Sequence, residues 1–343
     1  MGLTARLDDY QRRHRWIGLP LAVVYKFFDD QGPYLSALLT YYGFLSLFPL
    51  LLVMTTVLGF VLGGNPHLQQ EVVRSALREF PIIGTQLGQN VRSLHGSGLG
   101  LVVGIVATVY GGLGIAQAGQ AALNRVWGVP RNERPNPFMA RLKSLLLLVV
   151  LGFGVAITTV LSAVGAAAQG YGANVGGGAR IAAIAASMVV NAGLFVVAFR
   201  VMTARRIATR DVLVGALCAA VAWQVLQTAG TYYLQHKLRG ATEVYGLFGL
   251  VLGLIAWIYL EAVTVVLAAE INVVRAKRLW PRALLTPFTD RVELTDADER
   301  SYESYANSER HKGFEEVNVS FDRDTSDEAV ARPDKRTKSS GSP

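Results

Sequence analysis

Two carboxylates, which can bind a proton or a cation, lie in the last long apolar run of the chain. Glu261 sits near the middle of this run, at about residues 245–273, and Glu270 lies nearer its C-terminal end. If the run crosses a bilayer, an ionised carboxylate at its centre costs about 3 kcal/mol on insertion scales. Their separation places the two carboxylates on nearly opposite faces of a helix, so they do not form one site. Each is either a proton- or cation-coupled switch or a structural carboxyl satisfied by a neighbouring helix.

Uncharged polar side chains recur at helical spacing in the other apolar runs. The residues at which we predict a substrate path are Tyr42, Ser46, Gln117, Asn124, Gln224, Gln227 and Thr231. A polar side chain is costly in lipid, so these faces are expected to point into a helix bundle or a wet cavity. The alternative is interhelical hydrogen bonding, worth only about 0.6 kcal/mol per contact. The run at about 212–235 has the most such residues on one face and is the best candidate for a cavity wall.

The elements that must position these residues are six apolar runs, each about long enough to cross a membrane. A hydrocarbon core of about 30 Å needs about 20 mostly apolar residues in a helix. The runs lie at about 35–63, 98–121, 142–166, 181–203, 212–235 and 245–273. Because 51% of the residues are apolar and charge is confined to the loops and one tail, the sequence predicts an all-α, polytopic membrane bundle of six transmembrane helices.

Basic residues indicate the side of the membrane on which each loop lies. Eighteen Lys and Arg residues lie in the N-terminal segment, in the second and fourth loops and directly after the last run. Only six lie in the intervening loops. Loops rich in Lys and Arg stay in the cytoplasm, so we predict that both termini are cytoplasmic and that the chain is a multi-pass protein of the cell membrane. The basic residues behind the formal net charge of +8 then lie at the ends of the spans, where membrane lipids are the expected partners. A nucleic-acid partner would need one solvated basic surface instead.

The segments before and after the first run have separate predictions. Residues 1–34 form a cytoplasmic amphipathic segment, with one helix at 6–28 lying on the inner leaflet and Trp16 and Tyr25 at headgroup level. The loop at 64–97 is either a small helical cap on the outer side or a helix resting on the outer leaflet.

The C-terminal residues 281–343 are rich in Ser, Asp, Glu and Arg and poor in large apolar residues. Such a composition buries too little surface to offset the entropy of ordering, so we predict a disordered cytoplasmic tail. Within the runs, Gly100 and Gly104 are one of several GxxxG pairs, which permit close helix contact and leave a homo-oligomer open.

No motif in the chain predicts catalysis. The sequence lacks a G-x-x-x-x-G-K-[ST] loop, which excludes an ATP site of that type. Its five histidines are scattered over loops and both ends, without metal or triad spacing to carboxylates or to Cys218. With one cysteine, no intramolecular disulfide can form. We therefore expect no enzymatic activity, no cofactor and no bound metal.

Four segments of the chain resemble a known family. They are Ala37–Leu52 (ALLTYYGFLSLFPLLL), Ala121–Gly128 (AALNRVWG), Arg210–Ala216 (RDVLVGA) and the stretch from Tyr245-Gly through Trp257-Ile-Tyr259 to Ala269-Glu-Ile-Asn272. In order and spacing, over roughly residues 20–280, they resemble the YihY/BrkB family of inner-membrane proteins, and within it the YhjD-like branch. The chain departs from the usual Gly-Ala-Glu of that family at Ala268-Ala-Glu270.

The resemblance implies a six-span protein of the bacterial inner membrane, tied to envelope function and to the export or flipping of lipids. The older family label, ribonuclease BN, gains no support from the residues of this chain.

Two functions of different classes are therefore compatible with the sequence. One is a transporter or flippase of a lipid or amphipathic envelope component, with Glu261 or Glu270 as the protonatable element. The other is a non-transporting membrane scaffold of the cell envelope, in which the polar faces only hold helices together. A wet cavity lined by Gln224, Gln227 and Thr231 favours transport, and a dry, close-packed bundle there favours the scaffold.

Overall fold

The computed structural model describes residues 3–61, 98–147, 177–237, 242–289 and 292–321, and these parts contain helices and connecting turns but no strand. The long elements in chain order are α1 (Leu3–Arg13), α2 (Arg15–Asp29), α3 (Gly32–Val61), α6 (Gly98–Val126), α8 (Gly177–Met202), α9 (Thr209–Lys237), α10 (Thr242–Ala276) and α11 (Asp296–Ser308). A short 3-10 turn, η2 (Arg131–Glu133), follows α6, and residues 137–147 are helical.

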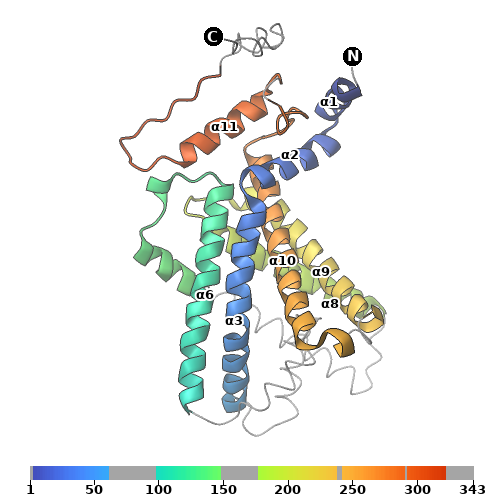
Figure 1. Cartoon of the computed structure of the whole chain (residues 1–343), viewed down its shortest axis with the longest axis vertical. Coiled ribbons are helices and arrows are strands. Elements are labelled where there is room, and N and C mark those ends of the chain that lie inside the picture. The colour runs from blue at the N-terminus through green and yellow to red at the C-terminus, as the bar shows by residue number, and fades with distance from the viewer. Residues whose placement is uncertain (1–2, 62–97, 148–176, 238–241, 290–291, 322–343) are drawn as a thin grey trace, which may run out of the picture.

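Five long helices form a bundle, and the three flanking helices lie across one end of it. α3 runs beside α6, and α10 packs between α3 and α9 (Figure 1). α1, α2 and α11 gather at the end where α3 begins and where α6 and α10 finish. The first and last described parts of the chain therefore meet on the same side of the bundle.

Among the residues that the structure describes, three helices carry an apolar window long enough to cross a membrane. The windows are Ala185–Met202 in α8, Thr209–Gly230 in α9 and Val251–Ala276 in α10. They coincide with the last three predicted runs, and α3 and α6 coincide with the first two. Of the third predicted run, residues 142–147 are helical, and its remainder and the loop at 64–97 lie outside the described residues. The all-helical prediction is confirmed for the described parts, whereas the number of six spans and their orientation stay predictions.

Glycines allow the bundle helices to approach closely. A Cβ added at Gly215 of α9 would lie 2.1 Å from the carbonyl oxygen of Ala268 in α10. One added at Gly111 of α6 would lie 2.7 Å from the Cβ of Ser46 in α3. Both distances are far below van der Waals contact, so these crossings depend on the missing side chain, as small-residue helix contacts in membranes do.

The main apolar core lies at the end of the bundle that α2 covers. Its fully buried members come from different helices and include Ala22 of α2, Val126 of α6, Val212 of α9 and Val273 of α10. Burying an aliphatic side chain of valine size stabilises a fold by about 1.5–3 kcal/mol. α2 is therefore held on the bundle by apolar packing.

This packing corrects the prediction of one surface helix at 6–28. The helix breaks at His14, and the inner face of α2 is buried against α10. The outer face does keep Trp16 exposed, at 69%. Tyr25, however, does not lie free at headgroup level, because its hydroxyl donates to the carbonyl of Leu284 at 2.6 Å.

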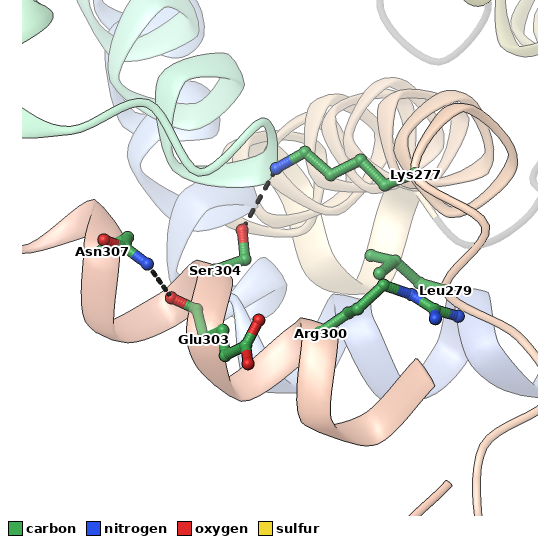
Figure 2. A pocket seen from close by; sticks show the side chains of 6 residues that line it. All are labelled: Lys277, Leu279, Arg300, Glu303, Ser304 and Asn307. Carbon is green, nitrogen blue, oxygen red and sulfur yellow. Dashed lines mark hydrogen bonds between the residues drawn. The ribbon is translucent and has the colours of Figure 1, made fainter. Parts of the chain in front are cut away.

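The prediction of disorder for the whole of 281–343 is also wrong, because residues 292–321 are described and contain α11. Thr295 caps this helix, with its side chain accepting from the backbone N–H of Asp298 while the Asp298 side chain accepts from the backbone N–H of Thr295. Such a capping box offsets the low apolar content by satisfying backbone donors. α11 also borders an open pocket beside the end of α10 (Figure 2). Residues 322–343 lie outside the description.

Candidate functional site

Three ionisable side chains from two helices meet in the interior at the covered end of the bundle. Lys26 and Asp30 lie one helical turn apart at the end of α2 and form an ion pair. Oε2 of Glu270, from α10, lies 3.4 Å from Nζ of Lys26. The exposed fraction is 3% for Lys26 and 0% for each carboxylate. These three residues are called the acid–lysine cluster below.

The local fold of α2 explains why charged residues are buried here. Ala22, Lys26 and Asp30 follow one another at four-residue spacing, so they share the face that packs against the bundle. The helix ends where the backbone N–H of Asp30 donates to the carbonyl of Lys26 at 2.9 Å. Gln31 then takes a left-handed φ of 61°. At Gly32 a Cβ would lie 2.3 Å from the ring of Phe27, so this tight turn needs glycine and fixes Asp30 beside the start of α3.

Two further elements close the cluster. Nε of Arg125, near the end of α6, lies 3.9 Å from Oδ1 of Asp30. The ring of Tyr305, from α11, lies 5.5 Å from Nζ of Lys26, within the range of a cation–π contact. Four helices therefore contribute a side chain to this one buried polar centre.

The charges of the cluster do not balance by themselves. Burial lowers the pKa of Lys26, but the charges of Glu270 and Asp30 raise it further, so the pKa ends above its usual value. Burial raises the pKa of Asp30, and Lys26 opposes only part of that rise. One buried ammonium thus faces two buried carboxyl groups, and the partly exposed Arg125 adds a more distant positive charge beside Asp30. A proton shared between the two carboxyl groups reduces the negative charge that remains. Because an uncompensated buried charge is costly, this arrangement is suited to take up and release one proton or cation.

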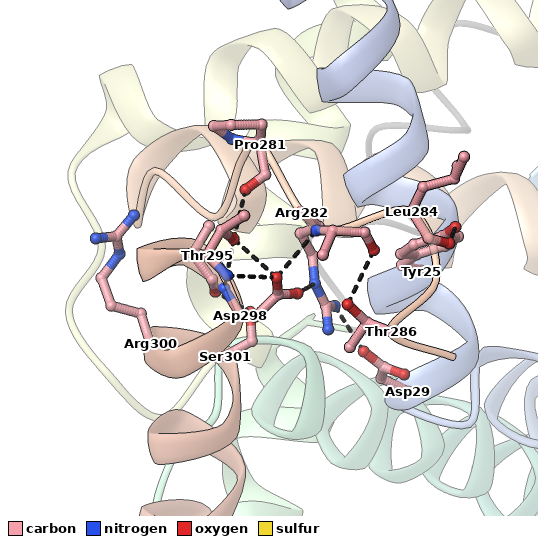
Figure 3. A network of polar contacts seen from close by, with 12 residues as sticks. Tyr25, Asp29, Pro281, Arg282, Leu284, Thr286, Thr295, Asp298, Arg300 and Ser301 are labelled. Carbon is pink, nitrogen blue, oxygen red and sulfur yellow. Dashed lines mark hydrogen bonds and ion pairs between the residues drawn. The ribbon is translucent and has the colours of Figure 1, made fainter. Parts of the chain in front are cut away.

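A second network of polar contacts anchors the C-terminal segment (Figure 3). The guanidinium of Arg282 is buried, with Nε donating to Asp298 at 2.8 Å and Nη1 donating to Asp29 at 2.7 Å. The other carboxylate oxygen of Asp298 accepts from the backbone of Ala283 at 2.9 Å. The segment after α10 is therefore joined both to α11 and to the end of α2.

Tyr305 links this network to the acid–lysine cluster. Its hydroxyl donates to Oδ2 of Asp29 at 3.3 Å, and its ring faces Lys26. Burial, and then the charges of Asp30 and Asp29, raise the pKa of Tyr305, so the phenol stays protonated. At the C-terminal end of α11, one turn after Tyr305, Glu309 pairs with Arg125 at 2.8 Å and with Arg131 at 2.7 Å. α11 thus covers the cluster and is fixed at several points.

The predicted path residues on α3 and α6 lie in helix contacts. Ser46 is buried, and its hydroxyl donates to the carbonyl of Gly43 at 3.0 Å. The ring of Tyr42 packs where a Cβ on Gly114 would lie, 2.2 Å from Cδ1. Asn124 is buried and accepts from the backbone N–H of Ala204 at 2.8 Å, joining α6 to the loop after α8. Gln117 is exposed on α6 and joins none of these contacts.

The predicted residues on α9 and α10 are not brought together into one described cavity. Gln224 and Gln227 are half-buried on α9, and the side chain of Thr231 lies outside the described residues. Glu261 is half-buried on α10, whereas Glu270 is fully buried in the acid–lysine cluster. The predicted separation of the two carboxylates into different sites agrees with these surroundings.

Sequence reasoning did not identify Lys26 and Asp30 as site residues, and Asp30 lies outside the predicted surface helix at 6–28. A usable signal was present, because Lys26 is the one basic residue between Leu19 and Phe28 and has an acidic partner four residues later. A four-residue pair of opposite charge inside an apolar run indicates a buried ion pair as readily as an exposed one. Among the residues described, no group of three or more His, Cys, Asp or Glu is arranged to hold a metal ion.

Comparison with known proteins identifies the family to which the chain is similar. Residues 23–289 match the family model described as virulence factor BrkB. The chain is 24% identical over 258 residues to the putative ribonuclease-like protein YfkH of Bacillus subtilis, covering 72% of this chain and 91% of that protein. It is 25% identical over 254 residues to the inner membrane protein YhjD of Escherichia coli, covering 69% and 74%.

It is also 24% identical over 239 residues to a UPF0761 membrane protein of Pseudoalteromonas atlantica, covering 68% and 78%. No solved structure matches the chain. The family resemblance drawn from four sequence segments is confirmed, and so is the assignment to the cell membrane, because the relatives are named as membrane proteins and three helices have spanning length.

Proposed function

The chain belongs to the virulence factor BrkB family of membrane proteins, and we propose that it is a transporter or flippase that moves a lipid or amphipathic envelope component across the cell membrane. The observation that carries this proposal is the acid–lysine cluster. It buries two carboxyl groups against one ammonium at the end of a helix of spanning length. Such a cluster is a natural site for the proton or cation that couples a gradient to movement.

The coupling step of the proposal is a change in the contact between α2 and α10. When Glu270 is ionised, its charge and that of Lys26 attract, and α2 is held on α10. When Glu270 takes up a proton, this attraction is lost, and α2 keeps its apolar packing and its link from Asp29 to Arg282. Proton uptake therefore biases the helices at this end between two arrangements, which is what a coupled transporter requires.

The path of the proposal follows the polar faces of α3, α6, α9 and α10. It uses the side chains predicted from the sequence, namely Tyr42, Ser46, Gln117, Asn124, Gln224, Gln227 and Thr231. Glu261, deeper in α10, is a second protonatable group beside this path. Six spans with both termini in the cytoplasm complete the proposal, and they place the acid–lysine cluster on the cytoplasmic side.

A non-transporting scaffold is the second candidate, and particular contacts favour it. Asn124 holds the loop after α8, and Gln120 of α6 donates to Ser144 at 2.8 Å. In a scaffold, all polar residues of the spans would act in this way, as links between helices. Neither candidate includes catalysis, and the word ribonuclease in the printed name of YfkH is said of that protein.

Reconstituted transport distinguishes the two candidates. Purified protein is placed in liposomes that carry a lipid with a fluorescent headgroup, and the fraction of lipid accessible to an outside quencher is followed with and without a pH gradient. A transporter accelerates transbilayer movement, and Glu270→Gln abolishes the effect of the gradient. Glu293→Gln, a change of the same type at an exposed position, is the matched control. No acceleration with any tested headgroup would establish the scaffold instead.

A further inference from the structure

The ammonium of Lys26 has the surroundings that a bound monovalent cation would have. Its Nζ is paired with Oδ2 of Asp30, lies 3.4 Å from Oε2 of Glu270 and lies 5.5 Å from the centre of the Tyr305 ring. A lysine ammonium is a compact point charge on a flexible stem. Two carboxyl groups and one aromatic face, from the end of α2, from α10 and from α11, therefore surround this charge in the interior of the protein.

The carboxyl groups of the cluster keep free acceptor positions. Oδ1 of Asp30 and both carboxyl oxygens of Glu270 are buried, and they accept no hydrogen bond from an N–H or O–H group of the described residues. The two carboxyl groups also lie close enough to each other to share a proton. Because a buried polar atom without a partner costs free energy, these oxygens favour the uptake of a further positive species.

A metal cation and a proton make different demands on this place. A hard metal cation needs a shell of oxygen atoms around a position of its own, and the ammonium already fills the position between Asp30 and Glu270. A metal ion would also lie beside that like charge, with the guanidinium of Arg125 at 3.9 Å from Asp30 as a second one. Such repulsion is stronger where water is excluded. A proton instead bonds to a carboxyl oxygen and needs no position of its own.

The other titratable groups around the cluster supply no free negative charge for a metal ion. Lys277 of α10 interacts electrostatically with the cluster and is a further cation. Asp29 is paired with Arg282 at 2.7 Å. The raised pKa of Tyr305 keeps its phenol neutral. The charges that face the two carboxyl groups from other elements are therefore positive.

We propose that the acid–lysine cluster exchanges protons and excludes metal cations, and that Lys26 excludes them by filling the cation position itself. As a statement about binding, this inference holds with or without transport. As the identity of the coupling ion, it rests on the proposed function, and it then assigns the proton rather than sodium or potassium.

Infrared spectroscopy of the purified full-length protein in detergent tests for the proton. At about pH 6 exposed carboxyl groups are ionised, so the absorption of protonated carboxyl groups comes from buried ones. We expect the native spectrum to contain one protonated carboxyl group more than that of Glu270→Gln, in which Lys26 balances Asp30 alone. Glu293→Gln, at an exposed position, is the matched control and is expected to keep the native absorption. Replacing choline chloride by sodium or potassium chloride is expected to leave this absorption unchanged.

Removing the ammonium is expected to turn the cluster into a metal site. In Lys26→Ala the position of Nζ is vacant between two carboxylates, so sodium or potassium chloride is expected to raise the thermal unfolding midpoint above that in choline chloride of the same ionic strength. Adding Glu270→Gln removes one ligand and is expected to abolish this rise. The native protein and Lys312→Ala, a control at an exposed position, are expected to unfold alike in all three salts.

Liposomes test the identity of the coupling ion. A pH gradient is expected to accelerate lipid movement, whereas a sodium or potassium gradient of the same size is not. Movement that responds to a metal gradient, or to no gradient, would overturn the assignment of the proton as coupling ion. If no lipid moves at all, the proposed function fails, and the two binding measurements still decide whether the cluster is a proton site.

Three binding results would overturn the inference. The first is that sodium or potassium removes the protonated-carboxyl absorption of the native protein or raises its unfolding midpoint. The second is that Glu270→Gln keeps the native absorption. The third is that a folded Lys26→Ala responds to neither metal. Since the infrared measurement uses no variant of Lys26, it decides the inference even if Lys26→Ala does not fold.

Discussion

Nζ of Lys26 in α2 lies 3.4 Å from Oε2 of Glu270 in α10, so a helix before the first predicted span is tied by charge to the last one. Both side chains are buried, and Asp30 adds a second carboxylate to the same ammonium. The N-terminal segment is therefore part of the bundle. Any change in the charge of Glu270 acts directly on the position of α2.

Removing the ammonium from this pair is expected to destabilise the protein strongly. Lys26→Met leaves Glu270 without its cation and Asp30 with only the more distant Arg125, and breaking a buried pair from one side costs about 3–5 kcal/mol. The measurement is the midpoint of thermal unfolding in detergent. Lys312→Met, at an exposed position, is the control and is expected to unfold like the native chain.

A double variant, Lys26→Met with Glu270→Gln, separates the effect of charge from the effect of packing. Glu270→Gln removes one of the two carboxylates, so adding it to Lys26→Met is expected to restore part of the lost stability, with a coupling of about 1–3 kcal/mol in a double-mutant cycle. Strictly additive effects of the two substitutions would contradict a direct interaction between these side chains.

α11 is expected to come loose when its buried carboxylate is neutralised. Asp298 is fully buried, binds Arg282 and completes the capping box with Thr295. Asp298→Asn keeps the shape but leaves Arg282 with Asp29 alone, at a cost of about 3 kcal/mol. Hydrogen exchange of residues 296–308 is then expected to accelerate, together with proteolysis near this helix.

The control for this change lies two residues earlier. Asp296 is exposed in the first turn of α11, where its negative charge interacts favourably with the helix dipole. Asp296→Asn is expected to cost about 0.5 kcal/mol and to leave the exchange of α11 nearly unchanged. Equal acceleration in both variants would mean that the Arg282 network does not hold the helix.

The sequence predicted the long helices well because their signal is local. An apolar run of α9 or α10 must be helical in a membrane, whatever surrounds it, since every backbone group has to be satisfied within the run. The acid–lysine cluster could not be predicted in this way, because Lys26 and Glu270 are far apart in the chain and meet only through the packing of α2 on α10. A charged residue in an amphipathic segment is usually solvated, and only tertiary structure reveals the exception.

The error over the C-terminal segment has a related cause. Composition predicts disorder when a segment has too little apolar surface to bury, and α11 has little. It is held instead by charged groups of other elements, such as Arg282, Arg125 and Arg131. Within the segment itself, the signal that could have been used is the capping box that starts at Thr295.

A methyl group at the closest helix crossing is expected to separate α9 from α10. In Gly215→Ala the new Cβ would overlap the carbonyl of Ala268 and disturb the hydrogen bond that the Gly215 N–H donates to Asn272 at 2.6 Å. Overpacking of this kind costs about 1–3 kcal/mol or more. Gly193→Ala on α8 meets nothing within 4 Å and is expected to be neutral or stabilising. Thermal unfolding of the two variants in detergent is the measurement, and similar midpoints would contradict the close crossing.

The proposed orientation is open to a labelling test that uses the single cysteine of the chain. In a Cys218→Ala background, His311→Cys places a thiol on the exposed segment after α11. With both termini in the cytoplasm, a membrane-impermeant maleimide is expected to label intact cells poorly and disrupted cells fully. Equal labelling in both preparations would place this end of the bundle outside.

Lys277 is expected to make stability depend on pH in the alkaline range. Its pKa is lowered from 10.5 to about 8 by burial and by Lys26 and Arg205, with Asp30 and Glu270 opposing, while Arg300 and Glu303 line the same pocket. Below about pH 8 the residue is protonated in both the folded and the unfolded state, so the full cost of its burial is present. Between about pH 8 and 10.5 the unfolded chain binds more protons than the folded one, so stability rises with pH.

The difference between the native chain and Lys277→Met isolates this contribution, because all other titrating groups are common to both. The native protein is expected to gain stability relative to the variant as the pH is raised from 8 to 10, measured as the difference in unfolding midpoint in detergent. A difference that stays flat, or falls, over this range would contradict a lowered pKa of the buried Lys277 ammonium.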